Sequence, residues 1–226
     1  MENIHTNYDA GFKKALSLFQ NKSLDFVGLH HLGLIQEPLN TEHVEFDVKY
    51  SFSDMAFLLS DGTGISMEWE ADISRDDLRR FAKYILEFEE QYKTDFTTII
   101  FTTKMTNIQV YESSTMIFRP VIVNLKKIDG EKVLEKIQEQ IRGGEEINEL
   151  ELIYVPLMYN ESRSVAELLK LVVSMAKKIE MNPEKREKIL LISTLVANKF
   201  VPEKEFQKIL GGKFKIFDFK LRNLSL

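Results

Sequence analysis

The chain contains no cysteine in its 226 residues. Disulfide bonds, thiolate zinc sites, iron–sulfur clusters and a cysteine nucleophile are therefore excluded together. It has four histidines, and they do not show the spacing of a zinc motif such as H-E-x-x-H: His5, His30, His31 and His43. We therefore expect the histidines to be structural or surface residues.

Long apolar runs are also missing. No stretch approaches the roughly 20 apolar residues that a helix needs to cross a bilayer, so no membrane association is expected. The first six residues, MENIHT, lack the basic start and the apolar stretch of a signal peptide. The expected location is the cytoplasm.

Two common catalytic motifs are absent as well. Gly211-Gly212-Lys213 lacks the spacing of a phosphate-binding loop, so we interpret the two glycines as a helix stop. No G-x-S-x-G elbow occurs, so the sequence does not favour serine hydrolase chemistry.

Negative charge is in mild excess, with a formal net charge of −5. This balance argues against a protein that coats nucleic acid, but not against a local basic groove, because steering depends on where the charges lie. The apolar fraction of 44% and the charged fraction of 29% are ordinary for a globular protein. The length suits one large domain, or one domain with an appendage.

Helical and extended patterns alternate along the first two thirds of the chain. Helical spacing predicts helices over residues 9–19, 74–92 and 131–142. Alternating or β-branched patterns predict strands over 42–48, 54–59, 65–70, 96–101 and 150–155, and one or two more strands within 111–125. From residue 162 onward the pattern is helical. The expected fold class is α/β, with a mixed central sheet flanked by helices and a helical C-terminal part.

The last stretch, residues 213–226, mixes basic and apolar side chains. Its apolar content is large for an exposed end, so we expect it to fold back onto the protein. The alternative is that it meets a partner chain, for example in a homodimer.

The clearest local unit is a hairpin. Residues 54–59 and 65–70 flank an Asp61-Gly62 pair, which is a strong turn signal between apolar runs. Residues two apart in a strand share a face. Ser66, Glu68 and Glu70 therefore lie on one face, opposite an apolar face that packs.

The hairpin register decides whether Asp54 joins these carboxylates. A connecting loop of three or five residues places Asp54 opposite Glu70 and diagonal to Glu68. A two-residue loop at Asp61-Gly62 places Asp54 opposite Trp69, on the other face. The glycine-rich turn favours the longer loop, which would bring three carboxylates within reach of one ion.

Three carboxylates in a partly buried place repel one another, so a cation is their natural partner. Oxygen ligands select a hard ion such as Mg²⁺ or Mn²⁺. Such an ion polarises a phosphoryl group and activates water, which predicts phosphodiester hydrolysis. The alternative is that these acidic residues are simply solvated at a strand end.

Five stretches then occur in a characteristic order: Tyr8–Lys13, Phe52–Asp54, Glu68–Glu70, Arg80 with Tyr84, and Leu152–Met158. In their order and spacing they resemble the PD-(D/E)XK nuclease superfamily, specifically the Rpn-type recombination-promoting nucleases and related transposase-like proteins. The resemblance covers roughly residues 8 to 200, and each motif by itself is weak.

The resemblance implies a restriction-endonuclease-like fold that acts on DNA with Mg²⁺ or Mn²⁺. It implies that Asp54 and Glu68 are the metal carboxylates, that the Trp69 backbone carbonyl is a further ligand, and that Asp9 supports the site from behind. We expect the nuclease-like core over residues 1–160 and a helical extension, packed on that core, over 161–226.

The third position of the motif departs from the family, because Glu70 stands where lysine or glutamine is usual. Lysine would activate the attacking water or stabilise developing negative charge, and glutamate cannot do the latter. Glu70 could serve as a base, hold a second ion, or mark a lost activity.

Basic residues follow the motif on the predicted helix. Arg75, Arg79 and Lys83 are candidates for contacts with DNA phosphates, although a solvated helix face is the alternative. Arg80 and Tyr84, four residues apart, can touch and are expected to orient the site.

The leading prediction is a metal-dependent DNA endonuclease, linked to recombination or transposition, in which Asp54, Glu68 and Glu70 form the catalytic group. The alternative is a catalytically inactive protein that keeps the nuclease fold as a nucleic-acid-binding or assembly module.

Overall fold

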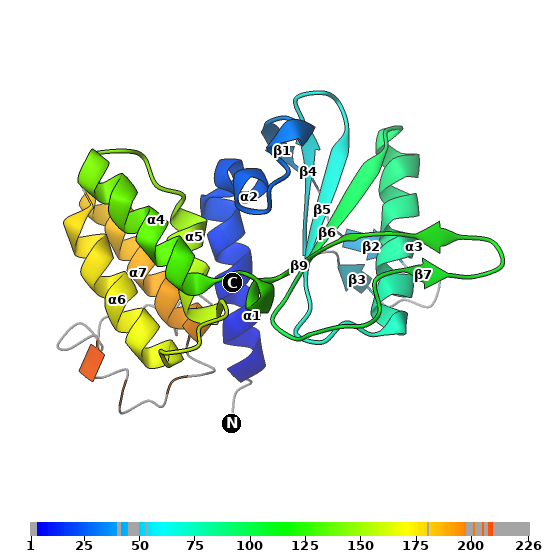
Figure 1. Ribbon diagram of the computed structural model, residues 1–226. Helices are drawn as coiled ribbons and strands as arrows, with labels where there is room; N and C mark the ends of the chain where they lie inside the picture. The colour runs from blue at the N-terminus through cyan, green and yellow to red at the C-terminus, as the bar shows by residue number, and fades with distance from the viewer. Residues whose placement is uncertain are drawn as a thin grey trace. The chain divides into compact units, whose positions relative to one another are not determined.

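The computed structural model describes residues 4–39, 42–44, 50–52, 54–179, 181–197, 201, 205 and 208–209, with side chains described from residue 11 onward except over 40–53. The chain forms two compact units (Figure 1). Residues 27–126 make up one, here called the sheet unit, and residues 1–26 with 127–226 make up the other, the helical unit. These boundaries differ from the division at residue 160, which stays a prediction about where a nuclease-like core ends.

The sheet unit is built on five strands in the order β1-β4-β5-β6-β9. Their bounds are β1 Ile35–Pro38, β4 Met55–Leu59, β5 Gly64–Trp69, β6 Phe96–Thr102 and β9 Val121–Asn124. The pairs β1–β4 and β4–β5 are antiparallel, whereas β5–β6 and β6–β9 are parallel. The predicted α/β class with a mixed central sheet is confirmed.

Short elements surround this sheet in the same unit. A 3-10 turn, η1, covers His30–Leu32. The strands β2 (Glu42–Val44) and β3 (Tyr50–Phe52) pair with each other, as do β7 (Tyr111–Glu112) and β8 (Ile117–Phe118). Residues 111–125 therefore contain strands as expected, but three of them, β7, β8 and β9, where one or two were expected. The strand expected over 42–48 is described only to residue 44.

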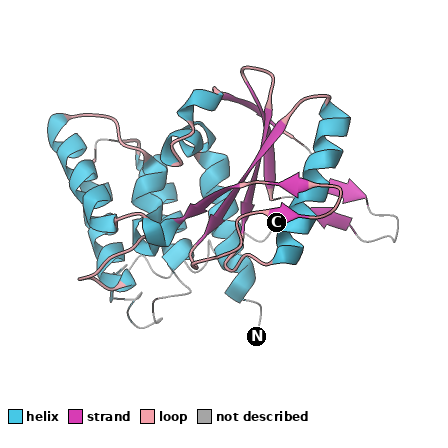
Figure 2. Cartoon of the chain, turned by 45° about the vertical axis from the view of Figure 1, so that its right-hand side comes forward, coloured by secondary structure: helices cyan, strands magenta, loops and turns pink. Residues whose placement is uncertain are grey.

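Helix α3, Arg75–Tyr92, connects the parallel strands β5 and β6, as a parallel pair requires (Figure 2). Ser74 begins it with a capping box, in which its hydroxyl accepts from the Asp77 N–H and the Asp77 carboxylate accepts from the Ser74 N–H. One face of α3 is buried against the sheet, in a cluster of Ala56, Ile73, Leu78, Phe81, Tyr84, Ile85, Phe88 and Ile100.

The β4–β5 hairpin turns through residues 60–62, and the Leu59 N–H donates to the Thr63 carbonyl to close it. The Asp61 Oδ1 atom accepts from both the N–H and the hydroxyl of Thr63, at 2.9 and 2.7 Å. Gly62 has a φ of +87°, a conformation that favours glycine. A Cβ at Gly64 would lie 2.4 Å from the Phe96 ring, so glycine at this position lets β6 approach closely.

The helical unit contains six α-helices within its described residues, of which α6 and α7 are the helical pattern expected after residue 162. They are α1 Ile4–Leu18, α2 Gln20–Phe26, α4 Gly130–Gly143, α5 Glu149–Tyr154, α6 Val165–Lys178 and α7 Pro183–Ala197. A 3-10 turn, η3, covers Val155–Leu157, and another, η2 at Leu125–Lys127, spans the boundary between the two units in the sequence. Tyr154 stacks on Phe12 of α1 at 5.1 Å between ring centroids, and its hydroxyl donates to the Phe12 carbonyl. The helices expected near residues 9–19 and 131–142 are confirmed.

The strand expected over residues 150–155 is wrong, because this segment forms α5 and η3. The Asn148 side chain accepts from the Leu150 N–H and thereby caps the helix. Five of its apolar side chains are fully buried: Leu150, Leu152, Ile153, Tyr154 and Val155. The segment therefore shows no helical period that would distinguish it from a buried strand.

Two expectations concern segments that the structure leaves largely undescribed. The helix stop at 211–212 and the tail at 213–226 lie outside the described residues. Within the described helices, none is long and apolar enough to cross a membrane.

Candidate functional site

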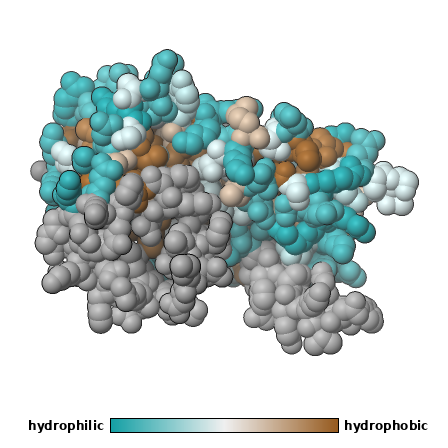
Figure 3. All heavy atoms as spheres, turned by 90° about the horizontal axis from the view of Figure 1, so that it is seen from below, coloured by the Kyte–Doolittle hydropathy of each residue, from teal (hydrophilic) through white to brown (hydrophobic). Residues whose placement is uncertain are grey.

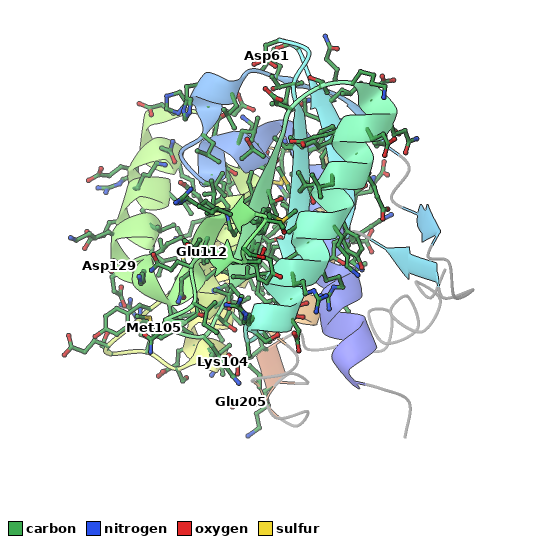
Figure 4. The ribbon with its side chains drawn as sticks, turned by 90° about the vertical axis from the view of Figure 1, so that its right-hand side faces the viewer. Asp61, Lys104, Met105, Glu112, Asp129 and Glu205 are labelled. Carbon is green, nitrogen blue, oxygen red and sulfur yellow. The ribbon has the colours of Figure 1, made fainter. Side chains whose placement is uncertain are left out.

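The acidic residues of the hairpin lie where β5 ends and β4 begins. Asp54 directly precedes β4, Glu68 is the last residue but one of β5, and Glu70 follows it. In Figure 4, Asp61 marks the hairpin turn at one end of the sheet unit and Lys104, which follows β6, lies toward the other end. The acidic residues therefore gather at the end of the sheet opposite the turn, where the parallel strands β5, β6 and β9 end.

The register of the hairpin places Asp54 opposite Glu68. The observed pairs are Met55 with Met67 and Ala56 with Ser66, and one further step pairs Asp54 with Glu68. The expected face is confirmed, but the expectation that Asp54 lies opposite Glu70 is wrong. The Leu59 N–H donates to the Thr63 carbonyl at 2.8 Å, so the loop is the three residues 60–62 and its centre lies one residue earlier than that of a five-residue loop over 60–64. The loop length stays odd, so the face is unchanged.

The carboxylates of Asp54 and Glu68 each accept a backbone N–H from the opposite strand of the hairpin. Glu68 is buried, with 2% of its surface exposed, and its Oε2 atom accepts from the Asp54 N–H at 3.1 Å. In return, the Asp54 Oδ2 atom accepts from the Trp69 N–H at 2.8 Å. The Ser66 hydroxyl donates to the Glu68 Oε1 atom at 2.9 Å. These charge-assisted bonds join the open end of the hairpin and bring two carboxylates together.

Glu70 is held by α3. The Arg80 guanidinium donates to the Glu70 Oε1 atom at 2.5 Å and lies 2.9 Å from the Asp77 Oδ1 atom. It also sits over the Phe81 ring, 4.8 Å from the centroid. Arg80 is therefore held by three partners. Its ion pair engages the carboxylate of Glu70, whose side chain is 26% exposed.

The environment shifts the pKa of both partners upward. Burial raises the pKa of the Glu70 carboxyl, the Asp77 charge adds to this effect, and the Arg80 charge opposes it. Burial acts to lower the pKa of Arg80, but the carboxylates of Glu70 and Asp77 outweigh it, so the arginine pKa is raised and the side chain stays charged.

Tyr84 lies one turn beyond Arg80 and is buried, with 3% of its surface exposed, in the core between α3 and the sheet. Its charge interaction with Arg80 is among the causes that raise the arginine pKa. The orienting role of Tyr84 stays a prediction.

The expected convergence of three carboxylates is not observed. Among the side chains that the structure describes, no group of three or more His, Cys, Asp or Glu residues is placed to hold a metal ion. Glu70 is instead turned toward Arg80. The donors that remain together are the carboxylates of Asp54 and Glu68. The Trp69 carbonyl joins them, because a strand residue directs its N–H and C=O to the same neighbouring strand and the Trp69 N–H reaches Asp54. This all-oxygen set suits Mg²⁺ or Mn²⁺ if water and substrate complete it.

The candidate DNA-contacting residues differ in their surroundings. Arg75 donates to the Glu112 carbonyl at 2.6 Å and lies 5.0 Å from the centroid of the Tyr111 ring, so it holds β7 against α3. Arg79 and Lys83 are exposed on α3. The sheet unit as a whole has 9 basic and 16 acidic residues, so any phosphate-binding surface on it is local.

Asp9 belongs to α1 in the helical unit, and its side chain lies outside those described. Its support of the carboxylates stays a prediction. The sequence reasoning did not single out Asp77, which is joined to both Ser74 and Arg80. The Ser-x-x-Asp pattern that opens α3 is a capping signature and could have identified it.

Comparison with known proteins adds little to this picture. No protein-family model matches the sequence, and no curated protein matches it. Among solved structures, the chain is similar to the small subunit of the heterodimeric restriction endonuclease R.BspD6I, with a TM-score of 0.23 and 11% sequence identity over 97% of this chain and 99% of that one. A TM-score of this size gives the likeness no weight for the function of this chain.

Some apolar side chains remain exposed, and Figure 3 shows apolar atoms in separate patches on one face.

Proposed function

We propose that this protein is a metal-dependent endodeoxyribonuclease of the PD-(D/E)XK type, which hydrolyses phosphodiester bonds in DNA with Mg²⁺ or Mn²⁺. The observation that supports this most is the pair of bonds across the open end of the β4–β5 hairpin, in which the Glu68 carboxylate accepts from the Asp54 N–H and the Asp54 carboxylate accepts from the Trp69 N–H. A buried carboxylate at a strand end, beside a second one, is costly unless a cation or donors compensate it. A link to recombination or transposition rests on the sequence resemblance.

In this proposal Asp54, Glu68 and the Trp69 carbonyl bind the ion. The ion, when bound, polarises the phosphoryl group and lowers the pKa of a coordinated water. Ser66 holds the Glu68 carboxylate in its plane by donating to Oε1. A lysine at position 70 would stabilise the negative charge that develops on the phosphate, and in this proposal Arg80 does so instead. Its ion pairs with Glu70 and Asp77 keep Arg80 charged and hold it at the same end of the sheet unit.

Substrate contacts would come from Arg79 and Lys83, which are exposed on α3, whereas Arg75, also exposed there, is engaged by the Glu112 carbonyl. Loss of a phosphate contact weakens binding and flattens its salt dependence. One site per chain cuts one strand at a time, and a homodimer would present a site to each strand, so a homodimer is part of the proposal. Sedimentation of the protein with and without DNA measures whether two chains associate.

The test is cleavage of supercoiled plasmid with Mg²⁺ or Mn²⁺. We compare the wild type with Asp54→Asn and Glu68→Gln, which keep the shape of each side chain. Each variant is expected to lose at least about a hundredfold in rate, as loss of a metal ligand exceeds loss of a supporting residue. Asp72→Asn is the matched control, because Asp72 is exposed and pairs only with Lys104 among the described partners. Full activity in Asp54→Asn would refute the assignment.

The ion pair between Glu70 and Arg80 favours a second candidate function. In this alternative the protein is inactive and keeps the nuclease fold to bind nucleic acid or to assemble with a partner. Mn²⁺ binding without cleavage of plasmid, single-stranded DNA or RNA would support this second candidate. In that case Asp54→Asn should still abolish Mn²⁺ binding, measured by titration calorimetry.

A further inference from the structure

Residues 103–119 lead from β6 toward β9 and are here called the arm. In Figure 4, Lys104 and Met105 at the start of the arm lie toward the end of the sheet unit that is opposite the β4–β5 turn. Just before the arm, the Thr102 hydroxyl donates to the Ala71 carbonyl at 3.2 Å. The base of the arm therefore lies next to the strand end that carries the proposed metal ligands.

One face of the arm is fixed on the sheet unit. In its β7–β8 hairpin Tyr111 pairs with Phe118, and both side chains pack against the buried cluster between α3 and the sheet. The side-chain amide of Asn124 donates to the Lys104 carbonyl at 2.8 Å and so holds the start of the arm against β9. The arm is therefore an ordered ribbon, and in Figure 1 the tip of its hairpin extends beyond α3.

The other face of the arm carries exposed apolar side chains. Neighbouring residues of a strand point to opposite faces, so Ile117 lies on the face opposite Phe118. Of the seven large hydrophobic side chains that are exposed in the described part of the chain, four belong to the arm. They are Met105, Ile108, Val110 and Ile117, with exposed fractions of 67, 37, 36 and 51%. Exposed apolar side chains that gather in one place indicate a contact surface.

Polar side chains on the arm favour DNA over a protein as the partner. Asn107 and Gln109 are exposed and alternate with apolar residues along the chain. Their amide groups can read a base edge through two hydrogen bonds, whereas the centre of a protein interface is depleted of polar groups.

The tip of the hairpin is uncharged and rich in hydroxyl groups. Ser113 closes the tip, because its N–H donates to the Met116 carbonyl at 2.9 Å and its hydroxyl accepts from the Met116 N–H at 3.2 Å. Ser114 and Thr115 lie between these two residues and are exposed. Serine and threonine hydroxyls contact both phosphate oxygens and base edges in complexes with DNA. A tip of this kind can approach a polyanion without repulsion.

Negative charge is scarce along the arm. Glu112 is its only acidic residue, whereas the sheet unit as a whole has 16. Arg75 lies beside Glu112 and donates to its carbonyl at 2.6 Å. The arm itself contributes Lys104, which pairs with the exposed Asp72, and Arg119, which is exposed and makes no ion pair with a described residue. DNA therefore meets less repulsion on the arm than on the unit as a whole.

We propose that the arm contacts DNA and that its β7–β8 hairpin enters a groove of the substrate duplex. Arg119 binds a phosphate, and Met105 and Ile117 contact sugars and base edges. A two-stranded ribbon fits the major groove, which is about 12 Å wide. The inference rests on the proposed function, because the DNA that meets the arm is the DNA held at Asp54 and Glu68.

The test is binding of a labelled duplex by the full chain, measured by fluorescence anisotropy in buffer with EDTA so that the DNA is not cut. Met105→Glu and Ile117→Glu place a carboxylate against the phosphates and should each weaken binding at least about tenfold. Leu34→Glu is the matched control, because Leu34 is 69% exposed and its N–H donates to the Ser60 hydroxyl at the β4–β5 turn. This control should bind DNA as the wild type does.

Arg119→Gln tests the phosphate contact. It should weaken binding several-fold and reduce the slope of log affinity against log salt concentration by about 1. Lys93→Gln is its control, because Lys93 is exposed and precedes Thr94, whose hydroxyl donates to the Gly62 carbonyl in the β4–β5 turn. The salt slope of this control should equal that of the wild type.

Two results would overturn the inference. The first is wild-type affinity in Met105→Glu and Ile117→Glu, or an equal loss of affinity in Leu34→Glu. The second is a Met105→Glu protein that sediments as a monomer without DNA while the wild type is a dimer, because a second copy would then cover the arm.

The inference and the proposed function fail separately. If the wild type cuts plasmid and the arm variants bind DNA normally, the nuclease assignment stands and the role of the arm is refuted. If binding depends on the arm but no plasmid is cut, the role of the arm stands and the nuclease assignment is refuted.

Discussion

Replacing Arg80 by methionine should destabilise the sheet unit in a pH-dependent manner. Arg80 joins Glu70 and Asp77, whose side chains are only 26% and 17% exposed. Methionine keeps much of the side-chain stem over Phe81 but leaves two partly buried carboxylates facing each other without a cation.

The magnitude lies between two known limits. Breaking a fully buried ion pair costs about 3–5 kcal/mol, whereas an exposed pair contributes about 0–1 kcal/mol. Arg80 is 41% exposed, so solvent screens part of its interaction with the two better-buried carboxylates. We expect Arg80→Met to lower the free energy of unfolding by about 2 kcal/mol at pH 7.

The pH dependence has a definite sign. The pKa of Glu70 is raised in the folded protein above its ordinary value of 4.5. The folded state therefore binds more protons than the unfolded state, and stability falls as the pH rises from that value through the folded pKa. Without Arg80 the folded pKa rises further, so the penalty of the variant should be largest at pH 7. It should shrink toward pH 4, where Glu70 is protonated.

The measurement is urea unfolding between pH 4 and 7 in buffer with EDTA, so that metal binding does not contribute. Arg80→Met, Glu70→Gln and the double variant form a cycle that isolates the coupling between the two residues. A penalty below about 0.5 kcal/mol, or one that does not change with pH, would refute the reasoning.

Two further predictions test the packing of the fold by thermal or urea unfolding. Gly64→Ala should cost about 1–3 kcal/mol, because its Cβ would meet the Phe96 ring at 2.4 Å. The same change at Gly143, where the nearest atom is 3.4 Å away, should stay within about 1 kcal/mol; equal costs would contradict the clash. Asn148→Ala should cost about 1 kcal/mol through loss of the α5 cap to the Leu150 N–H, and an unchanged unfolding midpoint would show that the cap does not contribute.

Local patterns were sufficient to predict the hairpin and the shared face of its acidic residues. Alternation with a period of two places Ser66 and Glu68 together whatever surrounds them. An odd loop length is enough to bring Asp54 to the same face, so the error of one residue in the position of the turn did not matter. Helix α3 was predictable for the same reason, since its cap and its apolar stripe are both local.

The tertiary structure decided the rest. Residues 150–155 are apolar except for Glu151, and only the surrounding helices, which bury all five apolar side chains, make the segment helical. The direction of Glu70 depended on Arg80, ten residues away on α3, and a strand pattern contains no information about which partner a side chain meets beyond the sheet. The pairing of buried Glu149 with Lys185 joins two residues that are 36 positions apart in sequence, so only the folded chain could bring them together.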